Sequence, residues 1–254
     1  MKLKIFKKTH IGKRSINQDY VETFLNKDGQ LLAVLCDGMG GHKAGDIASE
    51  MAVLQIGNHW KTTSFGNAQE ASTWLDQHIN LENKRIYRVA KTYSDLDGMG
   101  TTLVTAAYIK DEIIIGNIGD SRAYHLDQNE LKLITEDHSF ANELRLNGEI
   151  TEEEARTHRQ RHALTRSLGV FNKVEIDFFY LKKSEESVLM LCSDGLSNGL
   201  DHPEMQTILT RPVSLSDRGN ILIENALRNG STDNITVCLI ENSDKTHIEG
   251  KEGK

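Results

Sequence analysis

The fold is decided by residues Thr102 to Ile134, which read TLVTAAYIKDEIIIGNIGDSRAYHLDQNELKLI. Four apolar runs of strand length follow one another in this stretch, at 102–109, 112–118, 121–126 and 130–134. Short polar segments, such as Lys110-Asp111 and Asp127-Gln128-Asn129, separate the runs. Parallel strands require long crossover connections, so these short turns predict antiparallel pairing.

Helical spacing appears on both sides of this β-rich stretch. Ile47, Met51 and Leu54 predict a helix over 44–60, and a second apolar series predicts one over 69–90. Two more helices are expected near 203–210 and 216–228. A hairpin turn is expected at Asn26-Lys27-Asp28-Gly29, and further strands at 174–181, 187–192 and 234–240. Strands in runs, with helices in separate blocks, indicate an α+β fold.

The composition is that of a folded domain with a substantial core. Of the 254 residues, 38% are hydrophobic and 26% are charged, which excludes general disorder. Only two prolines occur, and no Ser/Gly-rich linker divides the chain. We therefore expect one domain over residues 1–240, followed by a polar, disordered tail at 241–254.

Charge and hydropathy exclude several classes of protein. The net charge of -7 argues against broad nucleic-acid binding, which requires a basic face. No apolar run approaches the roughly 18 residues of a membrane helix, and the basic start lacks the apolar stretch of a secretory signal. Cys36, Cys192 and Cys238 lie within apolar runs and are expected to be buried, reduced thiols. These features predict a cytoplasmic protein with no membrane or nucleic-acid partner.

Four aspartates stand at junctions between apolar runs and polar turns: Asp37, Asp120, Asp194 and Asp233. If the sheets bring these strand ends together, the carboxylates repel one another strongly unless cations bind between them. Carboxylate and carbonyl oxygens are the ligands that Mg²⁺ and Mn²⁺ prefer. Zinc is disfavoured, because no Cys/His group has the spacing of a structural zinc site. The pattern therefore predicts a Mg²⁺ or Mn²⁺ centre.

The segment Asp137–Gly169 departs from the strand pattern and is highly charged. Thr151 and Glu154 form a T-x-x-E capping box, which predicts the start of a short helix. Arg159 and Arg161 belong to its basic end. One interpretation is a charged, solvated insertion. The other is a mobile flap whose basic end contacts a phosphorylated partner.

Six short motifs occur along the chain in a fixed order: Arg14-Ser-Ile-Asn17-Gln18-Asp19, Asp37-Gly-Met-Gly-Gly-His42, Gly98-Met-Gly-Thr-Thr102, Gly119-Asp-Ser-Arg122, Ser193-Asp-Gly-Leu196 and Asp233-Asn-Ile-Thr236. In this series the sequence resembles the metal-dependent serine/threonine protein phosphatases of the 2C type, in their compact bacterial form. The resemblance covers about residues 3–240. Each motif alone is a weak signal, whereas six in order are specific.

The resemblance implies a fold and a metal centre. The fold is a four-layer α/β/β/α sandwich, with two antiparallel sheets flanked by helices and a flap insertion at about 138–169. Two Mn²⁺ or Mg²⁺ ions are implied at one end of the sandwich, with a weaker third ion beside them. In this family pattern Asp37 bridges the two ions and the Gly38 carbonyl binds one of them. Asp194 and Asp233 bind the other.

The remaining implied roles surround this centre. Asp19 acts mainly through bound water, and Asp120 together with Asp194 matches the position of the third ion. Arg14 holds the substrate phosphate. His42 has two open interpretations: general acid for the leaving serine or threonine oxygen, or a role in supporting the site without proton transfer.

Phosphate ester hydrolysis explains why such a residue set is needed. Two metal ions can deprotonate a bridging water and hold the attacking and phosphoryl oxygens in line, while an arginine fork neutralises phosphate charge. Direct attack by this water needs no covalent nucleophile. Accordingly, none of the three cysteines is followed six positions later by arginine; those positions hold His42, Asn198 and Asp244.

The predicted function is therefore a Mn²⁺- or Mg²⁺-dependent hydrolase of phosphoserine and phosphothreonine in proteins. The family resemblance implies phosphorylated proteins as partners, among them a bacterial Ser/Thr kinase and its substrates, and we expect a monomer. Two alternatives remain open: a non-catalytic phosphoprotein-binding scaffold of the same fold, and a hydrolase of small phosphoesters. Retention of Arg14 and the aspartates favours catalysis, and the arginine-rich flap favours a protein substrate.

Overall fold

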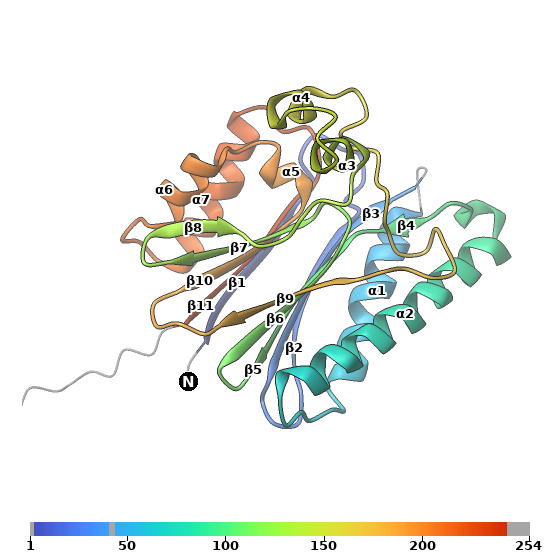
Figure 1. Ribbon diagram of the computed structural model, residues 1–254, viewed down its shortest axis with the longest axis horizontal. Coiled ribbons are helices and arrows are strands. Elements are labelled where there is room, and N and C mark those ends of the chain that lie inside the picture. Colours follow the sequence, from blue (N-terminus) through green and yellow to red (C-terminus); the bar gives the residue numbers. More distant parts are fainter. Residues whose placement is uncertain (1–2, 41–43, 243–254) are drawn as a thin grey trace, which may run out of the picture.

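The computed structural model describes residues 3–40 and 44–242. These residues form two antiparallel sheets packed face to face, with helices on both outer sides (Figure 1). One sheet has the strand order β1-β11-β10-β7-β8. The other has the order β2-β3-β5-β6-β9, and the short strand β4 pairs with β3. The expected α+β sandwich with antiparallel sheets is confirmed.

The strands are β1 (Leu3–His10), β2 (Asp19–Leu25), β3 (Leu31–Met39), β4 (Gly100–Thr101), β5 (Leu103–Ile109), β6 (Glu112–Ile118), β7 (Arg122–Asp127), β8 (Glu130–Leu133), β9 (Asp177–Lys182), β10 (Val188–Cys192) and β11 (Ile235–Asn242). The helices are α1 (Gly45–Trp60), α2 (Ala68–Thr92), the 3-10 helix η1 (Ser94–Leu96), α3 (Phe140–Leu146), α4 (Glu152–Thr157), α5 (Asp194–Ser197), α6 (His202–Leu209) and α7 (Leu215–Arg228). All four strands expected between 102 and 134 are present, as are the four expected helices.

Several elements were not predicted from the pattern, among them β1 and α3. β1 is rich in lysine and lies at the edge of its sheet, where five of its eight residues are exposed, so the apolar signal is weak. α3 lies within the charged segment and buries only Ala141. The capping box that begins α4 is present as predicted, with the Thr151 side chain accepting a bond from the Glu154 backbone N–H.

The alternation of side chains along β3 builds two cores at once. Leu31, Ala33 and Leu35 point toward the β1-β11-β10-β7-β8 sheet and pack in the layer between the two sheets. Leu32 and Val34 point the opposite way, into the core under α1 and α2. Every one of these side chains is buried, because β3 is covered on both faces. The strand therefore reads as a continuous apolar run.

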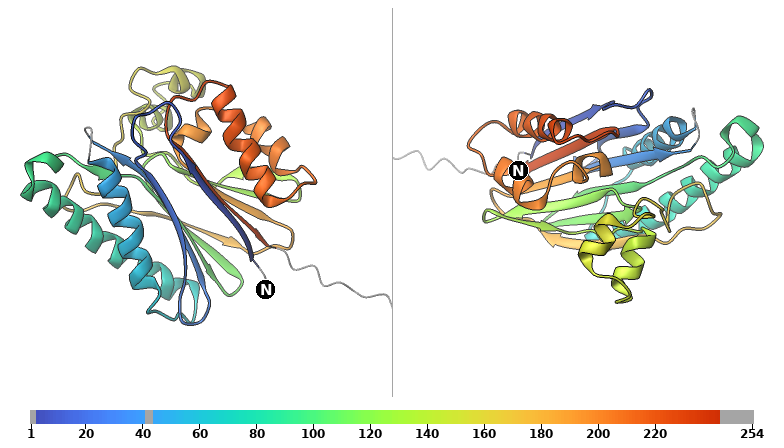
Figure 2. Two further views of the ribbon diagram at one scale, coloured as in Figure 1. Left: turned by 180° about the vertical axis from the view of Figure 1, so that it is seen from behind. Right: turned by 90° about the horizontal axis from the view of Figure 1, so that it is seen from above.

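Helices α6 and α7 cover the outer face of the β1-β11-β10-β7-β8 sheet, as Figure 2 shows from behind. Leu222 and Ile223 of α7 share a buried cluster with Val237 and Leu239 of β11. β11 continues to Asn242, two residues beyond the expected boundary of the domain. Glu241 is held there by ion pairs with Arg218 and with Lys4, and the rest of the expected tail lies outside the described residues. Among the described helices, none has the length and hydropathy needed to cross a membrane.

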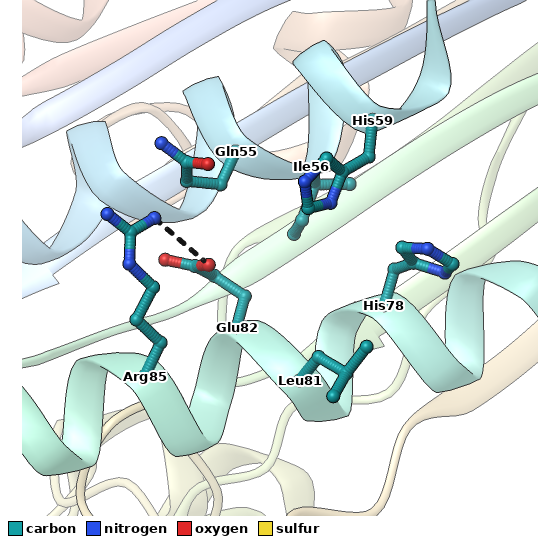
Figure 3. Close-up of a pocket in the computed structure, with 7 residues that line it drawn as sticks. All are labelled: Gln55, Ile56, His59, His78, Leu81, Glu82 and Arg85. Atoms are coloured by element: carbon teal, nitrogen blue, oxygen red, sulfur yellow. Dashed lines mark ion pairs between the residues drawn. The ribbon is translucent and has the colours of Figure 1, made fainter. Parts of the chain in front are cut away.

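A cavity of about 300 Å³ lies between α1 and α2 (Figure 3). Its lining comprises Gln55, Ile56, His59, His78, Leu81, Glu82 and Arg85. Glu82 is only 5% exposed. Within the described part of the chain its Oε1 atom has no hydrogen-bond partner, and its ion pair with Arg85 is long, at 3.6 Å. Burial raises the pKa of Glu82 to about 7, although Arg85 opposes the rise.

The raised pKa of Glu82 gives the first prediction. The unfolded carboxyl ionises near pH 4.5 and the folded one near 7, so protein stability falls as pH rises between these values. Glu82→Gln removes this loss and should stabilise the protein at pH 8, but not at pH 4.5, by on the order of 1–3 kcal/mol. Urea unfolding in EDTA at both pH values measures the difference. Glu50→Gln, at an exposed carboxylate of α1, is the matched control. A Glu82→Gln effect that is the same at both pH values would contradict the assignment.

Candidate metal centre

The predicted aspartates come from both sheets and meet at one end of the sandwich. Asp19 opens β2 and faces Asp37 near the end of β3 in the antiparallel register. Asp194 directly follows β10 and Ser193, and Asp233 lies just before β11. The Ser193 hydroxyl donates to Oδ2 of Asp19 at 2.8 Å and so joins the two groups across the sheets. Asp120 lies in the turn from β6 to β7, where the chain passes from one sheet to the other.

The carboxylates raise one another's pKa values. Burial raises the pKa of Asp19 to about 7, and the charges of Asp194 and Asp233 add to the rise, against hydrogen bonds from Thr236 and Ser193. Burial also raises the pKa of Asp37 well above its usual range, with further contributions from Asp19 and Asp194. Without a cation, this end of the sandwich holds negative charge that neither solvent nor hydrogen bonds fully compensate.

The donor set fits a divalent cation. Oδ1 of Asp19 and Oδ1 of Asp194 are buried and lack a hydrogen-bond partner within the described residues. Burial raises the pKa of Asp120 well above normal, and the charge of Asp194 raises it further. Unpartnered carboxylate oxygens are the hard ligands that Mg²⁺ and Mn²⁺ take, and a bound ion would remove both the repulsion and the unmet hydrogen-bonding capacity.

Backbone and hydroxyl contacts fix Asp37. Its N–H donates to Oγ1 of Thr102 at 2.9 Å, and its carbonyl accepts from the Thr102 N–H at 2.8 Å. The Thr101 hydroxyl donates to the same carbonyl at 2.9 Å. Both threonines belong to the motif Gly98-Met-Gly-Thr-Thr102, but no role was predicted for them from the sequence. Their contacts show why threonines follow Gly100: they hold the β3 end that carries the acid.

Gly38 permits a close approach of the chain to α1. A Cβ atom at this position would lie 2.0 Å from the Gly45 carbonyl oxygen and 2.7 Å from the Gln18 carbonyl oxygen. Any side chain would therefore push α1 away from the end of β3. The glycine thus has a steric reason, besides the carbonyl role that the family pattern implies.

Arg14 lies at the rim of the centre, in the connection between β1 and β2. Its guanidinium donates to Oδ2 of Asp233 at 2.7 Å, and the side chain is 56% exposed. This hydrogen bond, together with the charges of Asp233, Asp194 and Asp37, raises the pKa of Arg14. The structure therefore places a solvent-accessible cation beside the carboxylate cluster, where an anionic substrate can reach it.

The segment with α3 and α4 lies over the same end of the sandwich (Figure 1). The side chains of Arg159 and Arg161 are exposed on it. His162 lies closer to the aspartates, with its Nδ1 atom 3.6 Å from Oδ2 of Asp194. Ligand atoms of Asp120, His162 and Asp194 all lie within 4.8 Å of one another. His162 was not among the predicted site residues, because nothing in the local sequence marks its proximity to Asp194.

His42 lies outside the described residues, so its two interpretations stay open. The structure thus brings together Arg14 and five carboxylates: Asp19, Asp37, Asp120, Asp194 and Asp233. The two flap arginines lie farther out, on an exposed surface.

Comparison with known proteins identifies the family of the chain. The sequence matches the family model for protein phosphatase 2C over residues 7–227. It is 46% identical over 229 residues to a Listeria welshimeri protein named serine/threonine phosphatase stp, covering 90% of this chain and 91% of that one.

Two solved structures extend the likeness to the fold. The Streptococcus agalactiae serine/threonine phosphatase superposes with a TM-score of 0.92 at 42% identity, covering 95% of this chain and all of the other. The catalytic domain of the phosphatase PstP, in complex with two manganese ions, gives a TM-score of 0.84 at 31% identity, covering 95% of this chain and 99% of that one. With a family model matched over residues 7–227 and a fold shared with solved members, the chain belongs to the protein phosphatase 2C family.

Proposed function

We propose that this chain is a Mn²⁺- or Mg²⁺-dependent phosphatase that hydrolyses phosphoserine and phosphothreonine in proteins. The observation that carries the proposal is the meeting of five aspartates, two with unpartnered oxygens, beside the accessible guanidinium of Arg14. The names of the relatives, serine/threonine phosphatases, support the same reaction. The complex of PstP with two manganese ions supports the choice of metal.

The proposed ligands follow the family pattern. Asp37 and the Gly38 carbonyl would hold the core ions together with Asp194 and Asp233, and Asp19 would contact them through water. Asp120 and Asp194 would hold a weaker third ion. When bound, the ions supply an activated water for direct attack on phosphorus and stabilise charge on the phosphoryl oxygens.

Arg14 has two partners in the proposed reaction. In the structure it pairs with Asp233, and its exposed fork can receive two phosphoryl oxygens at the rim. Binding there orients the phosphate toward the carboxylate cluster. His42 is proposed as the general acid that protonates the leaving oxygen. The alternative is that His42 supports the site without proton transfer. Arg159 and Arg161 would contact acidic or phosphorylated regions of the protein substrate.

The proposed partners are phosphorylated proteins, including a bacterial Ser/Thr kinase and the proteins it modifies. The proposed oligomeric state of this chain is a monomer. The three cysteines are free and buried. Reduced thiols of this kind fit the reducing environment of the cytoplasm, which we propose as the location.

The metal assignment predicts a large loss of activity in ligand variants. Asp37→Ala and Asp194→Ala should each lower Mn²⁺-dependent release of phosphate from a phosphothreonine peptide by at least about 100-fold, because each removes charge that holds the ions. Asp95→Ala, an exposed acid on η1, is the control and should keep the wild-type rate. Unchanged rates in the two ligand variants would overturn the assignment. Tight phosphopeptide binding without turnover in saturating Mn²⁺ would favour the scaffold alternative.

The flap contact predicts a dependence on the type of substrate. Arg159→Glu combined with Arg161→Glu should lower kcat/KM for a phosphoprotein by roughly tenfold, while hydrolysis of a small aryl phosphate changes little, because only the protein reaches the flap. Lys84→Glu combined with Arg88→Glu, at two exposed basic residues of α2, controls for the change in net charge. Equal losses on both substrates would remove the proposed flap contact.

Removal of the metal predicts a stability change with a definite sign. The folded-state pKa values of Asp19, Asp37 and Asp120 are raised, so the apo protein loses stability as pH rises above about 4, and the part due to Asp19 is lost up to about pH 7. Mn²⁺ should therefore raise the thermal unfolding midpoint more at pH 8 than at pH 5. In EDTA at pH 8, Asp19→Asn should unfold at a higher temperature than the wild type, since it removes one buried charge. A lower midpoint for this variant would show that carboxylate repulsion does not limit apo stability.

A further inference from the structure

The turn that carries Asp120 is held on both sides by side chains from other elements. Ser121 and Thr102 share a hydrogen bond between their buried hydroxyls, at 2.7 Å. Gly119 exchanges two hydrogen bonds with His138: its N–H donates to Nδ1 of the ring at 3.1 Å, and its carbonyl accepts from the His138 backbone N–H at 3.0 Å. Gly119 has φ +100, and an added Cβ would meet Thr102 at 2.7 Å, so the turn needs glycine here.

The hydrogen bonds of His138 define its tautomer. Since Nδ1 accepts a backbone N–H, the ring proton lies on Nε2. Nε2 lies 3.0 Å from Oδ2 of Asp177 and donates to it, and Oδ1 of Asp177 accepts from Arg166 at 2.8 Å. His138 is only 6% exposed. The carboxylate therefore orients the ring so that its acceptor nitrogen faces Gly119.

His138 also stands where the two ends of the flap meet. Its carbonyl accepts from the Thr165 N–H at 2.9 Å. Next to it, Ser139 and Leu164 form an antiparallel bridge, and the Phe140 N–H donates to the Ala163 carbonyl at 2.8 Å. The returning arm of the flap thus runs directly from His162, beside Asp194, to the residues bonded to His138.

We infer that His138 is a positioning residue that, oriented by Asp177, fixes the Gly119–Ser121 turn and so holds Asp120 where it can share a divalent ion with Asp194. The inference deepens the proposed function and rests on it, because it concerns the weaker ion site. The same residue ties the base of the flap to this turn. Displacement of the flap base is therefore transmitted to Asp120 through two hydrogen bonds.

Two substitutions of His138 separate positioning from general structural support. His138→Asn retains an oxygen near Nδ1 that can accept the Gly119 N–H but cannot reach Asp177. His138→Gln retains a donor near Nε2 for Asp177 but no acceptor for Gly119. Both variants remove the imidazole ring of His138, so a purely structural role of the ring predicts similar effects of the two variants.

The experiment is calorimetric titration of the metal-free full chain with Mn²⁺. The wild type should show a weaker binding step besides the tighter ones. Asp120→Asn should abolish this weaker step and leave the tighter ones. His138→Gln should weaken that same step by about tenfold, and His138→Asn should keep it within about threefold of wild type. His78→Gln, on α2, is the control. Equal effects of the two His138 variants, or no weaker step sensitive to Asp120→Asn, would overturn the inference.

A second experiment does not depend on variants of His138 that fold. Long-range ¹H–¹⁵N correlation of the metal-free protein should show Nε2 of His138 protonated and Nδ1 unprotonated. Asp177→Ala should abolish this single tautomer and weaken the Asp120-dependent Mn²⁺ step. A ring protonated on Nδ1 in the wild type, or an unchanged spectrum and titration in Asp177→Ala, would contradict the inference. Because neither method requires turnover, a chain that binds Mn²⁺ as described but hydrolyses no phosphopeptide would refute the proposed function alone.

Discussion

Repulsion among carboxylates at one end of the sandwich is the constraint on which the rest of the structure depends. Asp19, Asp37 and Asp120 all have raised pKa values, because each is buried near other acids. Folding must hold these groups together against their charge. The chain meets the constraint with a rigid frame of apolar strands, with hydroxyl donors such as Ser193, and with Arg14 at the rim. A divalent cation neutralises the repulsion that remains among the carboxylates, so metal binding and protein stability are linked.

The topology makes this cluster depend on the packing of the two sheets. Asp19 and Asp37 belong to one sheet, whereas Asp194 lies shortly after β10 and Asp233 shortly before β11 of the other. The layer between them, with Leu35 among its buried residues, sets their separation. A change in this apolar layer would shift two pairs of carboxylates relative to each other. Core packing far from any ligand therefore bears directly on metal affinity.

The sequence could predict the acids but not most of the contacts that hold them. An aspartate at the end of an apolar run is a local signal, and the strands that carry these aspartates were predictable from their hydropathy. That the acids converge followed only from the family resemblance, because sheet order depends on contacts between distant segments. His138 and Asp177 bond across separate segments, and no spacing rule links them. Glu82 looks like a solvent-facing helical residue, yet it is buried between α1 and α2, where tertiary packing overrides the local pattern.

Asp120 differs from the other acids in the way it is held. Asp19 and Asp37 lie within strands of one sheet and Asp194 begins α5, whereas Asp120 lies in a turn between the sheets. Its neighbours Gly119 and Ser121 are held by His138 and Thr102, and one of these supports belongs to the base of the flap. Sheet-bound ligands cannot move without disturbing a core, but a turn held by a few hydrogen bonds can shift at small cost. We therefore propose that the ion site that includes Asp120 responds to the flap, while the proposed core site stays fixed.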